Sequence, residues 1–473
     1  MALPSWPCLH KGDAHALVLP RWLLPALVSL AGCANLAPPY ARPDPAVPYA
    51  DQAAQPAASE AAELGWRAFF SDPRLRAVVG LALTHNRDLR VAALNVERAR
   101  AQYRISDAAR LPSVNLGAGA SRSDNGSSLS ASVGLAGFEL DLFGRVKNLG
   151  EAALQSYLAT DESRRSVQIS LVAETANAWL SLAADLERQR LAQQTLDTRQ
   201  RSYALTQRMH ELGAITGLAL AQAQSSVDSA RVEIANYATL IAQDRNALEL
   251  LLGSAVPAEL LPRADEALGA VSALVELPTG VPSSLLQRRP DVLAAEHALR
   301  ASLADIGVAR AERFPRISLT ASAGSASREL SGLFKSGSGS WSFGPSLSLP
   351  IFDGGASRAQ VQVAELNREI ALAGYDKAVQ TAFREVADAL AQRATLAERL
   401  AAQRSLNEAT ERQLRLAEAQ FRAGSTTRLE VLDAQRSLYA SQQALIALRL
   451  TEQSNRITLY KVLGGGWNDD ERR

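Results

Sequence analysis

The chain has 473 residues, of which 47% are apolar but only 5% aromatic, so its apolar content comes largely from Ala, Leu and Val. With 50 Lys and Arg against 49 Asp and Glu, the formal net charge is +1, which gives no reason to expect a nucleic-acid partner. Both cysteines, Cys8 and Cys33, lie near the start, and the five histidines show no metal-site spacing. This composition favours closely packed helices and argues against a thiol enzyme or a metalloenzyme.

The first segment predicts the signal sequence of a lipoprotein. The apolar run 22–30 is too short to span a bilayer and is typical of a secretory signal peptide. It ends in Leu30-Ala31-Gly32-Cys33, which resembles a bacterial lipobox. Residues 1–32 are therefore expected to be a signal peptide and Cys33 the lipidated N-terminus, the alternative being an ordinary signal peptide with a chance cysteine. In the resembled class, Ala34 rather than Asp implies sorting to the outer membrane.

Residues 33–70 predict a surface tether, because prolines recur in this segment and prevent a regular helix or a central strand. No later stretch offers 18 or more consecutive apolar residues, so a transmembrane helix is not expected in the mature chain.

The rest of the sequence contains an internal duplication. Glu174, Gly213 and Gly253 recur 211 residues later as Glu385, Gly424 and Gly464. Three landmarks with one offset are improbable by chance. The sequence predicts four parts: a first repeat over 71–253, a linker over 254–282, a second repeat over 283–464 and a tail over 465–473.

Each repeat predicts the same series of elements. Ser71-Asp72-Pro73 is typical of a helix start. Apolar residues that alternate with Ser and Gly then predict β-hairpins over 113–142 and 316–352. Proline-free helical patterns predict long helices over 146–212 and 357–423, which end at Gly213 and Gly424. Return helices are expected over 217–252 and 427–463.

The long helices also show the heptad spacing of coiled coils. Apolar residues recur in steps of four and three in both repeats. The two stripes are Val172, Ala176, Trp179, Ala183 and Leu186, and Ala359, Val363, Leu366, Ile370 and Ala373.

Each predicted strand has roughly ten residues, the length of a tilted transmembrane β-strand. The alternative is a soluble hairpin with one face on a core. Four strands cannot close a barrel, and an open sheet edge cannot lie in lipid. If these strands span a membrane, several chains must share one barrel, and a trimer would supply twelve strands.

Four stretches together resemble the signatures of outer-membrane efflux channels, in the lipoprotein branch of the OprM/NodT type that is related to TolC. These are 140–145 (LDLFGR), 287–292 (QRRPDV), 306–310 (IGVAR) and 429–435 (LEVLDAQ).

The resemblance implies a mainly α fold with a small transmembrane β part. Three chains would form an α-barrel tunnel of long coiled coils and a shared 12-stranded β-barrel. It further implies no enzymatic activity and no cofactor beyond the lipid on Cys33. The partners would be a periplasmic adaptor and an inner-membrane pump, usually proton-driven and of the RND type.

The resemblance also assigns roles at the two helix turns. Gly213 and Gly424 would lie where adaptor hairpins insert, although both also serve simply to end a helix. Leu429 and Asp433 match positions that constrict the tunnel tip by an apolar ring and a carboxylate ring, and Arg436 lies close enough to pair with Asp433. The alternative for Asp433 is a solvated surface acid. Phe421 stands where the family often has Tyr.

Two other functions compete with an export channel. A secreted or lipid-anchored coiled-coil scaffold would use the long helices without a pore, but the matching hairpins in both repeats argue against it. An envelope hydrolase would need a Ser/His/Asp set, a phosphate loop or a His cluster, and the sequence offers none of these.

Overall fold

The computed structural model describes residues 34–43, 65–124, 126–266, 268, 274 and 287–465. The predicted signal peptide, Cys33 and residues 466–473 lie outside this part. The chain divides into two compact units, and each unit combines segments from both repeats. The sheet unit comprises Met1–Pro39, Ile105–Glu151 and Leu303–Glu365. The helical unit comprises Tyr40–Arg104, Ala152–Ser302 and Leu366–Arg473.

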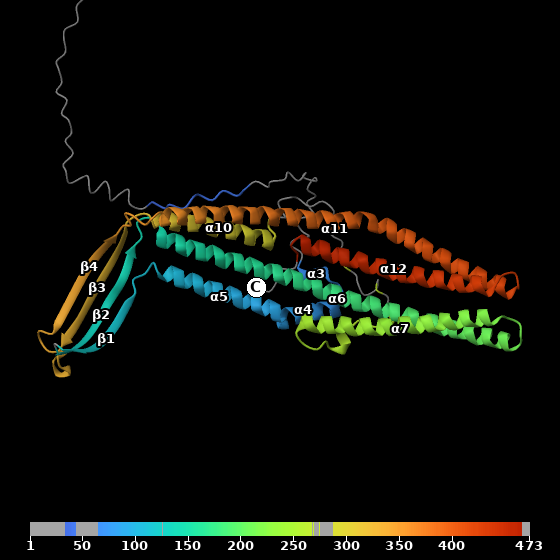
Figure 1. The fold of residues 1–473 in the computed structure, drawn as a ribbon. Coiled ribbons are helices and arrows are strands. Elements are labelled where there is room, and N and C mark those ends of the chain that lie inside the picture. Colours follow the sequence, from blue (N-terminus) through green and yellow to red (C-terminus); the bar gives the residue numbers. More distant parts are fainter. Residues whose placement is uncertain are drawn as a thin grey trace, which may run out of the picture. The chain divides into compact units, whose positions relative to one another are not determined.

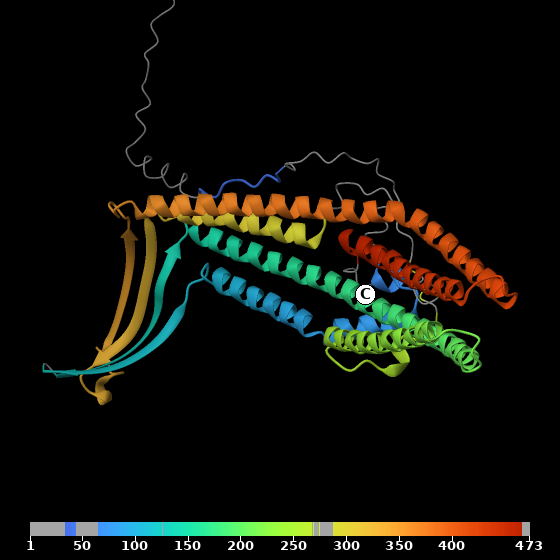
Figure 2. The same ribbon diagram turned by 45° about the vertical axis from the view of Figure 1, so that its right-hand side comes forward.

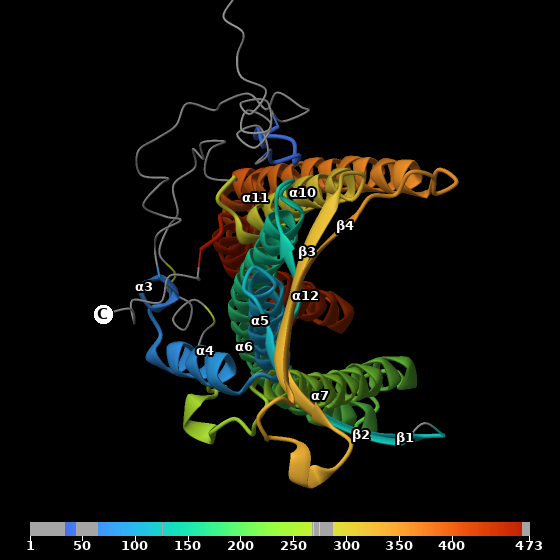
Figure 3. The same cartoon turned by 90° about the vertical axis from the view of Figure 1, so that its left-hand side faces the viewer.

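The sheet unit contains one antiparallel sheet with the strand order β1-β2-β3-β4 (Figures 1 and 2). Its strands are β1 (Val114–Ser123), β2 (Gly126–Leu140), β3 (Arg316–Ser327) and β4 (Gly339–Ser348). Each predicted hairpin supplies two neighbouring strands, and the pairing of β2 with β3 joins the repeats. The β3–β4 loop carries the short helix η2 (Leu330–Gly332) beyond the end of the sheet (Figure 3).

No strand residue of this sheet is fully buried in the single chain. Every residue of β1 is exposed, and β4 has one partly buried residue. Large apolar side chains are among the exposed ones, with Leu116 and Trp341 each 81% accessible. No described part of the chain covers a face of the sheet as a core would. The soluble hairpin with one buried face is therefore not what forms.

The helices follow the duplicated plan. The first repeat contains α4 (Pro73–His85), α5 (Arg87–Ala108), α6 (Arg145–Glu211) and α7 (Gly217–Leu252). The second contains α10 (Pro290–Ala311), α11 (Ala356–Arg422) and α12 (Arg428–Val462). Two short helices lie outside the predicted bounds of the first repeat: α3 (Trp66–Phe69) in the segment 33–70, and η1 (Ala258–Leu260) in the predicted linker. The end of segment 33–70 is not a surface tether, because Trp66 and Phe69 are buried in the main core of the helical unit. Asp72 caps α4, because its carboxylate accepts a hydrogen bond from the backbone N–H of Arg74 at 2.7 Å. Among the described helices, none is apolar over a stretch long enough to cross a membrane.

Within the helical unit, α7 lies beside the C-terminal half of α6, and α12 lies beside that of α11 (Figure 1). Aromatic side chains from both repeats share the main core of this unit. The rings of Phe69 and Tyr460 stack with centroids 4.0 Å apart, and the buried indole of Trp179 donates to the carbonyl oxygen of Leu260 at 3.0 Å. Burial of such large side chains contributes about 1.5–3 kcal/mol each.

The two heptad stripes have different environments. All five residues of the first stripe are buried in α6. In the second stripe, Val363, Leu366 and Ile370 are 49%, 54% and 70% exposed, so the described residues of the chain do not cover this stripe. Regular spacing places apolar residues on one helix face, but it does not specify which segment covers that face.

Candidate functional site

Two helix turns with the same geometry end the long helices. In the first, Gly213 has a φ of +71°, and the N–H groups of Gly213 and Ala214 donate to the carbonyls of His210 and Met209. In the second, Gly424 has a φ of +76°, and Gly424 and Ser425 bond in the same pattern to Phe421 and Gln420. Both are Schellman motifs, in which the glycine occupies a left-handed conformation that L side chains avoid.

Replacing both turn glycines is expected to destabilise the helix ends through the backbone alone. A Cβ at either position meets nothing within 4 Å, so steric contact contributes no penalty. The left-handed backbone costs about 1 kcal/mol for each of Gly213→Ala and Gly424→Ala. Asn at these positions should restore part of the loss. Thermal unfolding of the purified protein measures both effects.

Gly374→Ala is the matched control, because Gly374 is an ordinary helical glycine at which an added Cβ would also meet nothing within 4 Å. This change should stabilise the protein by roughly 0.5–1 kcal/mol. Equal effects at Gly213 and Gly374 would contradict the backbone argument.

The predicted gate residues share one exposed face of α12. Leu429 is 46% exposed, and the side chains of Asp433 and Arg436 are 58% and 53% exposed. A guanidinium nitrogen of Arg436 lies 3.2 Å from a carboxylate oxygen of Asp433. The opposite face of α12 buries Val431 and Ala434 against Ala417 of α11. Packing between the helices therefore orients the three predicted residues away from their own hairpin.

Phe421 has a role that does not need a hydroxyl group. The guanidinium of Arg428 lies 5.2 Å from the centre of the Phe421 ring, in a cation–π arrangement. Burial lowers the pKa of Arg428, while Glu418 opposes this shift. The aromatic side chain thus connects the last turn of α11 with the first turn of α12.

A polar layer between α6, α7 and α12 was not predicted. The hydroxyl of Tyr237 donates to the side-chain oxygen of Gln443 at 2.9 Å and so links the two return helices. Arg199 donates to the carbonyl of Ser226 at 2.9 Å and lies 5.6 Å from the centre of the Tyr439 ring. Burial raises the pKa of Tyr439 to about 12. No sequence pattern points to this layer, because its members come from distant segments.

An acidic pair belongs to the same part of the helical unit. Asp185 of α6 is almost buried and pairs with Arg188 at 2.6 Å. Burial, together with the charge of Asp185, raises the pKa of the Asp244 carboxyl on α7 to about 6. Ionisation of Asp244 above that pH adds a negative charge beside Asp185, and the resulting repulsion opposes the packing of α7 on α6.

Asp244→Asn is expected to stabilise the protein at pH 7. The folded-state pKa of about 6 exceeds the ordinary value of 3.8, so the folded protein holds this proton more tightly. The stability that comes from this proton is complete below pH 3.8 and is lost as the pH rises through 6. The gain should be on the order of 1 kcal/mol at pH 7 and much smaller at pH 4. Melting temperatures at both pH values measure it.

Asp228→Asn serves as the control, because Asp228 is an exposed acid on the same helix, paired with Arg231 at 3.1 Å. It should show no pH-dependent gain. A gain for Asp244→Asn that is the same at pH 4 and pH 7 would rule out the raised pKa.

The signature stretch 287–292 has a structural role in the helical unit. The side chain of Arg289 is 9% exposed and lies 2.7 Å from the carboxylates of both Asp291 and Glu385. It also donates to the carbonyl oxygen of Val462 at 2.9 Å. Burial acts to lower the pKa of Arg289, but the hydrogen bonds to the two acids outweigh it and raise the pKa. One guanidinium thus joins the start of α10 to α11 and the end of α12.

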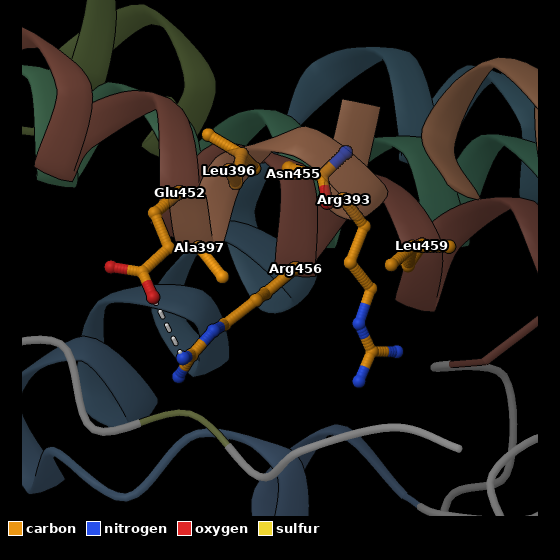
Figure 4. A pocket seen from close by; sticks show the side chains of 7 residues that line it. All are labelled: Arg393, Leu396, Ala397, Glu452, Asn455, Arg456 and Leu459. Atoms are coloured by element: carbon orange, nitrogen blue, oxygen red, sulfur yellow. Dashed lines mark hydrogen bonds and ion pairs between the residues drawn. The ribbon is translucent and has the colours of Figure 1, made fainter. Parts of the chain in front are cut away.

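A small cavity between α11 and α12 is a packing feature (Figure 4). Its volume is about 150 Å³, below the roughly 300–1,000 Å³ of ligand pockets. Arg456 pairs with Glu452 at 3.0 Å, and Asn455 donates to the Ala389 carbonyl at 2.9 Å. The lining residues are Arg393, Leu396, Ala397, Glu452, Asn455, Arg456 and Leu459.

Known proteins share this arrangement over nearly the whole chain. The family model described as outer membrane efflux protein matches residues 78–254 and 281–465. The probable efflux pump outer membrane protein TtgC of Pseudomonas putida is 46% identical over 462 residues, covering 93% of each chain. A membrane protein structure from Pseudomonas aeruginosa matches with 44% identity and a TM-score of 0.84, covering 92% of this chain and 98% of that one.

The open state of the Neisseria gonorrhoeae MtrE outer membrane channel has 38% identity and a TM-score of 0.84. That match covers 93% of this chain and 100% of the MtrE chain. The mainly helical fold with four antiparallel strands is thus that of TolC-like outer-membrane channels. The chain belongs to the outer membrane efflux protein family.

Proposed function

We propose that three copies of this chain assemble into the outer-membrane conduit of a tripartite efflux pump, which conducts exported small molecules passively. The observation that carries this proposal is the four-stranded sheet. It has two open edges, β1 and β4, and apolar side chains exposed on its faces. Pairing β4 of one copy with β1 of the next would close twelve strands and leave no edge in lipid.

The exposed apolar helix residues support the same assembly. Val363, Leu366 and Ile370 form an uncovered stripe on α11, and Val91 and Leu94 on α5 are 56% and 52% exposed. Water-exposed apolar rows of this kind are typical of helix faces that pack against another chain. In a trimer they would lie between neighbouring copies.

The partners would be a periplasmic adaptor and an inner-membrane pump, proton-driven and of the RND type. The adaptor would contact the helix turns at Gly213 and Gly424, where the backbone is exposed. Relatives of similar identity are named for toluene, for antibiotics and for cations. One channel architecture therefore serves unlike compounds, which favours selection of the exported compound by the pump.

At the tip, Leu429 and Asp433 would form an apolar ring and an acidic ring that close the tunnel. Their common exposed face on α12 supports this role, because three-fold symmetry would bring each residue to its own copies. The pair between Asp433 and Arg436 would reduce repulsion among the three carboxylates.

The assembly is tested by fractionation of cells followed by gel electrophoresis without heating. An outer-membrane trimer that dissociates on heating supports the conduit. A soluble monomer would overturn it in favour of the envelope scaffold.

Cys33 is expected to be the lipid-bearing N-terminus, because Leu30-Ala31-Gly32-Cys33 follows a short apolar run. Several acyl chains anchor a protein far more strongly than one. Mass spectrometry of the N-terminal peptide should show the added acyl mass, and an unmodified thiol would refute the assignment. Cys33→Ser should reduce the yield of channel without abolishing it.

A further inference from the structure

The segment that follows Cys33 is held in place within the sheet unit. The side-chain oxygen of Asn35 accepts hydrogen bonds from the side-chain amide of Asn148 at 2.8 Å and from the N–H of Ala37 at 3.2 Å. A guanidinium nitrogen of Arg310 lies 3.5 Å from the carbonyl oxygen of Leu36. Residues 35–37 are thus fixed against the start of α6 and the last turns of α10.

Two glycines make room for this segment, and each belongs to a signature stretch of the family. A Cβ on Gly307 would first clash with the side-chain amide of Asn148, and it would lie 2.8 Å from the Cβ and 2.9 Å from the nitrogen of Ala37. A Cβ on Gly144 would lie 3.2 Å from the side-chain oxygen of Asn35, and Gly144 also has a φ of +74°. A side chain at Gly307 would therefore displace the segment.

A cavity of about 350 Å³ lies beside the same two elements, at the end of the sheet where β2, β3 and β4 meet the helices. Its apolar wall includes Phe143 and Phe314, whose rings stack 4.6 Å apart. Its polar wall includes Arg145 and Arg316, which pair with Glu139 at 2.6 and 3.6 Å, together with the acids Asp141 and Glu312. The full lining is Glu139, Leu140, Asp141, Leu142, Phe143, Arg145, Ala311, Glu312, Phe314, Pro315, Arg316, Ser348, Leu349 and Pro350.

Chain length limits how far the predicted lipid attachment point can lie from this cavity. Asn35 contacts Gly144, and both sequence neighbours of Gly144, Phe143 and Arg145, line the cavity. Cys33 precedes Asn35 by two residues, which span at most about 7 Å. A long acyl group on the Cys33 sulfur would therefore be within reach of the cavity while residues 35–37 keep their contacts.

We propose that this cavity seats the lipid of Cys33, taking the glycerol unit and the first part of one acyl chain, while the remaining hydrocarbon enters the bilayer. The inference rests on the lipidation of Cys33 proposed above. The stacked rings and prolines suit methylene groups. Arg145 and Arg316 both pair with Glu139, and their remaining N–H groups suit ester carbonyl oxygens. The volume lies at the lower end of the range for ligand pockets, roughly 300–1,000 Å³. The lipid then acts as part of the folded sheet unit as well as a membrane anchor.

Photo-crosslinking tests the occupant directly. The full-length protein is made with Phe314→p-benzoylphenylalanine, irradiated in membranes and digested. We expect the peptide that contains position 314 to be joined to the lipid of the Cys33 peptide. Position 334 is the control, because Phe334 lies in the β3–β4 loop, is 81% exposed and does not line the cavity. Crosslinks from position 314 to free phospholipid or to a second copy of the chain would overturn the proposal.

A double-mutant cycle tests whether binding of the lipid in the cavity stabilises the protein. Melting temperatures are compared in one detergent for the wild type, Cys33→Ser, Phe314→Ala and the double variant. The stabilisation lost with the lipid should shrink when Phe314 is removed, because the two groups interact. The same cycle with Phe334→Ala should be additive. Additive effects of Cys33→Ser and Phe314→Ala would overturn the proposal that this cavity holds the lipid.

Mass spectrometry of the same samples separates the two proposals. If Cys33 carries no lipid, the lipidation assignment fails, and the seat fails with it. The other outcome is that Cys33 is lipidated while position 314 yields no crosslink and the melting temperatures are additive. In that case only the assignment of the cavity is wrong, and the lipidation of Cys33 stands.

Discussion

A channel with both Leu429→Ala and Asp433→Ala is expected to show several-fold higher single-channel conductance than the wild type. In the proposed trimer, an apolar ring at Leu429 would resist wetting and a carboxylate ring at Asp433 would repel anions, so the two barriers would act in series. Their spacing of four residues places them one helical turn apart on the exposed face of α12. Removing Asp433 also breaks its ion pair with Arg436, in which the two side chains lie 3.2 Å apart. Each single variant should therefore open the tip less than the double variant.

Planar-bilayer recordings measure the conductance. Cells that lack the adaptor and pump should also become sensitive to large antibiotics such as vancomycin. The control is Leu240→Ala with Asp228→Ala, which removes an exposed leucine and the acid of an equivalent ion pair from α7. Unchanged conductance in a correctly assembled double variant would refute the gate and leave the channel assignment intact.

Arg289→Ala is expected to be the most destabilising single change considered. It would leave the carboxylates of Asp291 and Glu385 without their common cation and the Val462 carbonyl without a donor. Breaking a buried ion pair costs about 3–5 kcal/mol. The two carboxylates are each 34% exposed, so we expect roughly 2–4 kcal/mol here. If the chain forms the proposed trimer, the fraction of heat-modifiable trimer should also fall.

The adjacent Arg288 supplies a matched control, because it is exposed in the same signature stretch. Arg288→Ala should change the free energy of unfolding by no more than about 0.5 kcal/mol. Denaturant unfolding of both variants measures the difference. Similar losses at the two positions would contradict the structural role assigned to Arg289.

The sequence by itself determined the local elements of this protein. Period-two alternation after Pro112 and Pro315 predicted hairpins, and the strands run over Val114–Leu140 and Arg316–Ser348 with their turns. Glycines at positions 213 and 424 predicted the ends of the long helices, which the structure places at Glu211 and Arg422. These features depend on neighbouring residues, since backbone conformation at a glycine or a proline is set locally.

Only the tertiary structure decided which faces meet. The link from Tyr237 to Gln443, the raised pKa of Asp244 beside Asp185 and the fixing of Asn35 by Asn148 each join segments that lie far apart in the sequence. The second heptad stripe has the same spacing as the first, yet it is exposed where the first is buried. Periodicity places side chains on one face of a helix, but burial depends on a partner surface that chain-distant segments, or other copies of the chain, must supply.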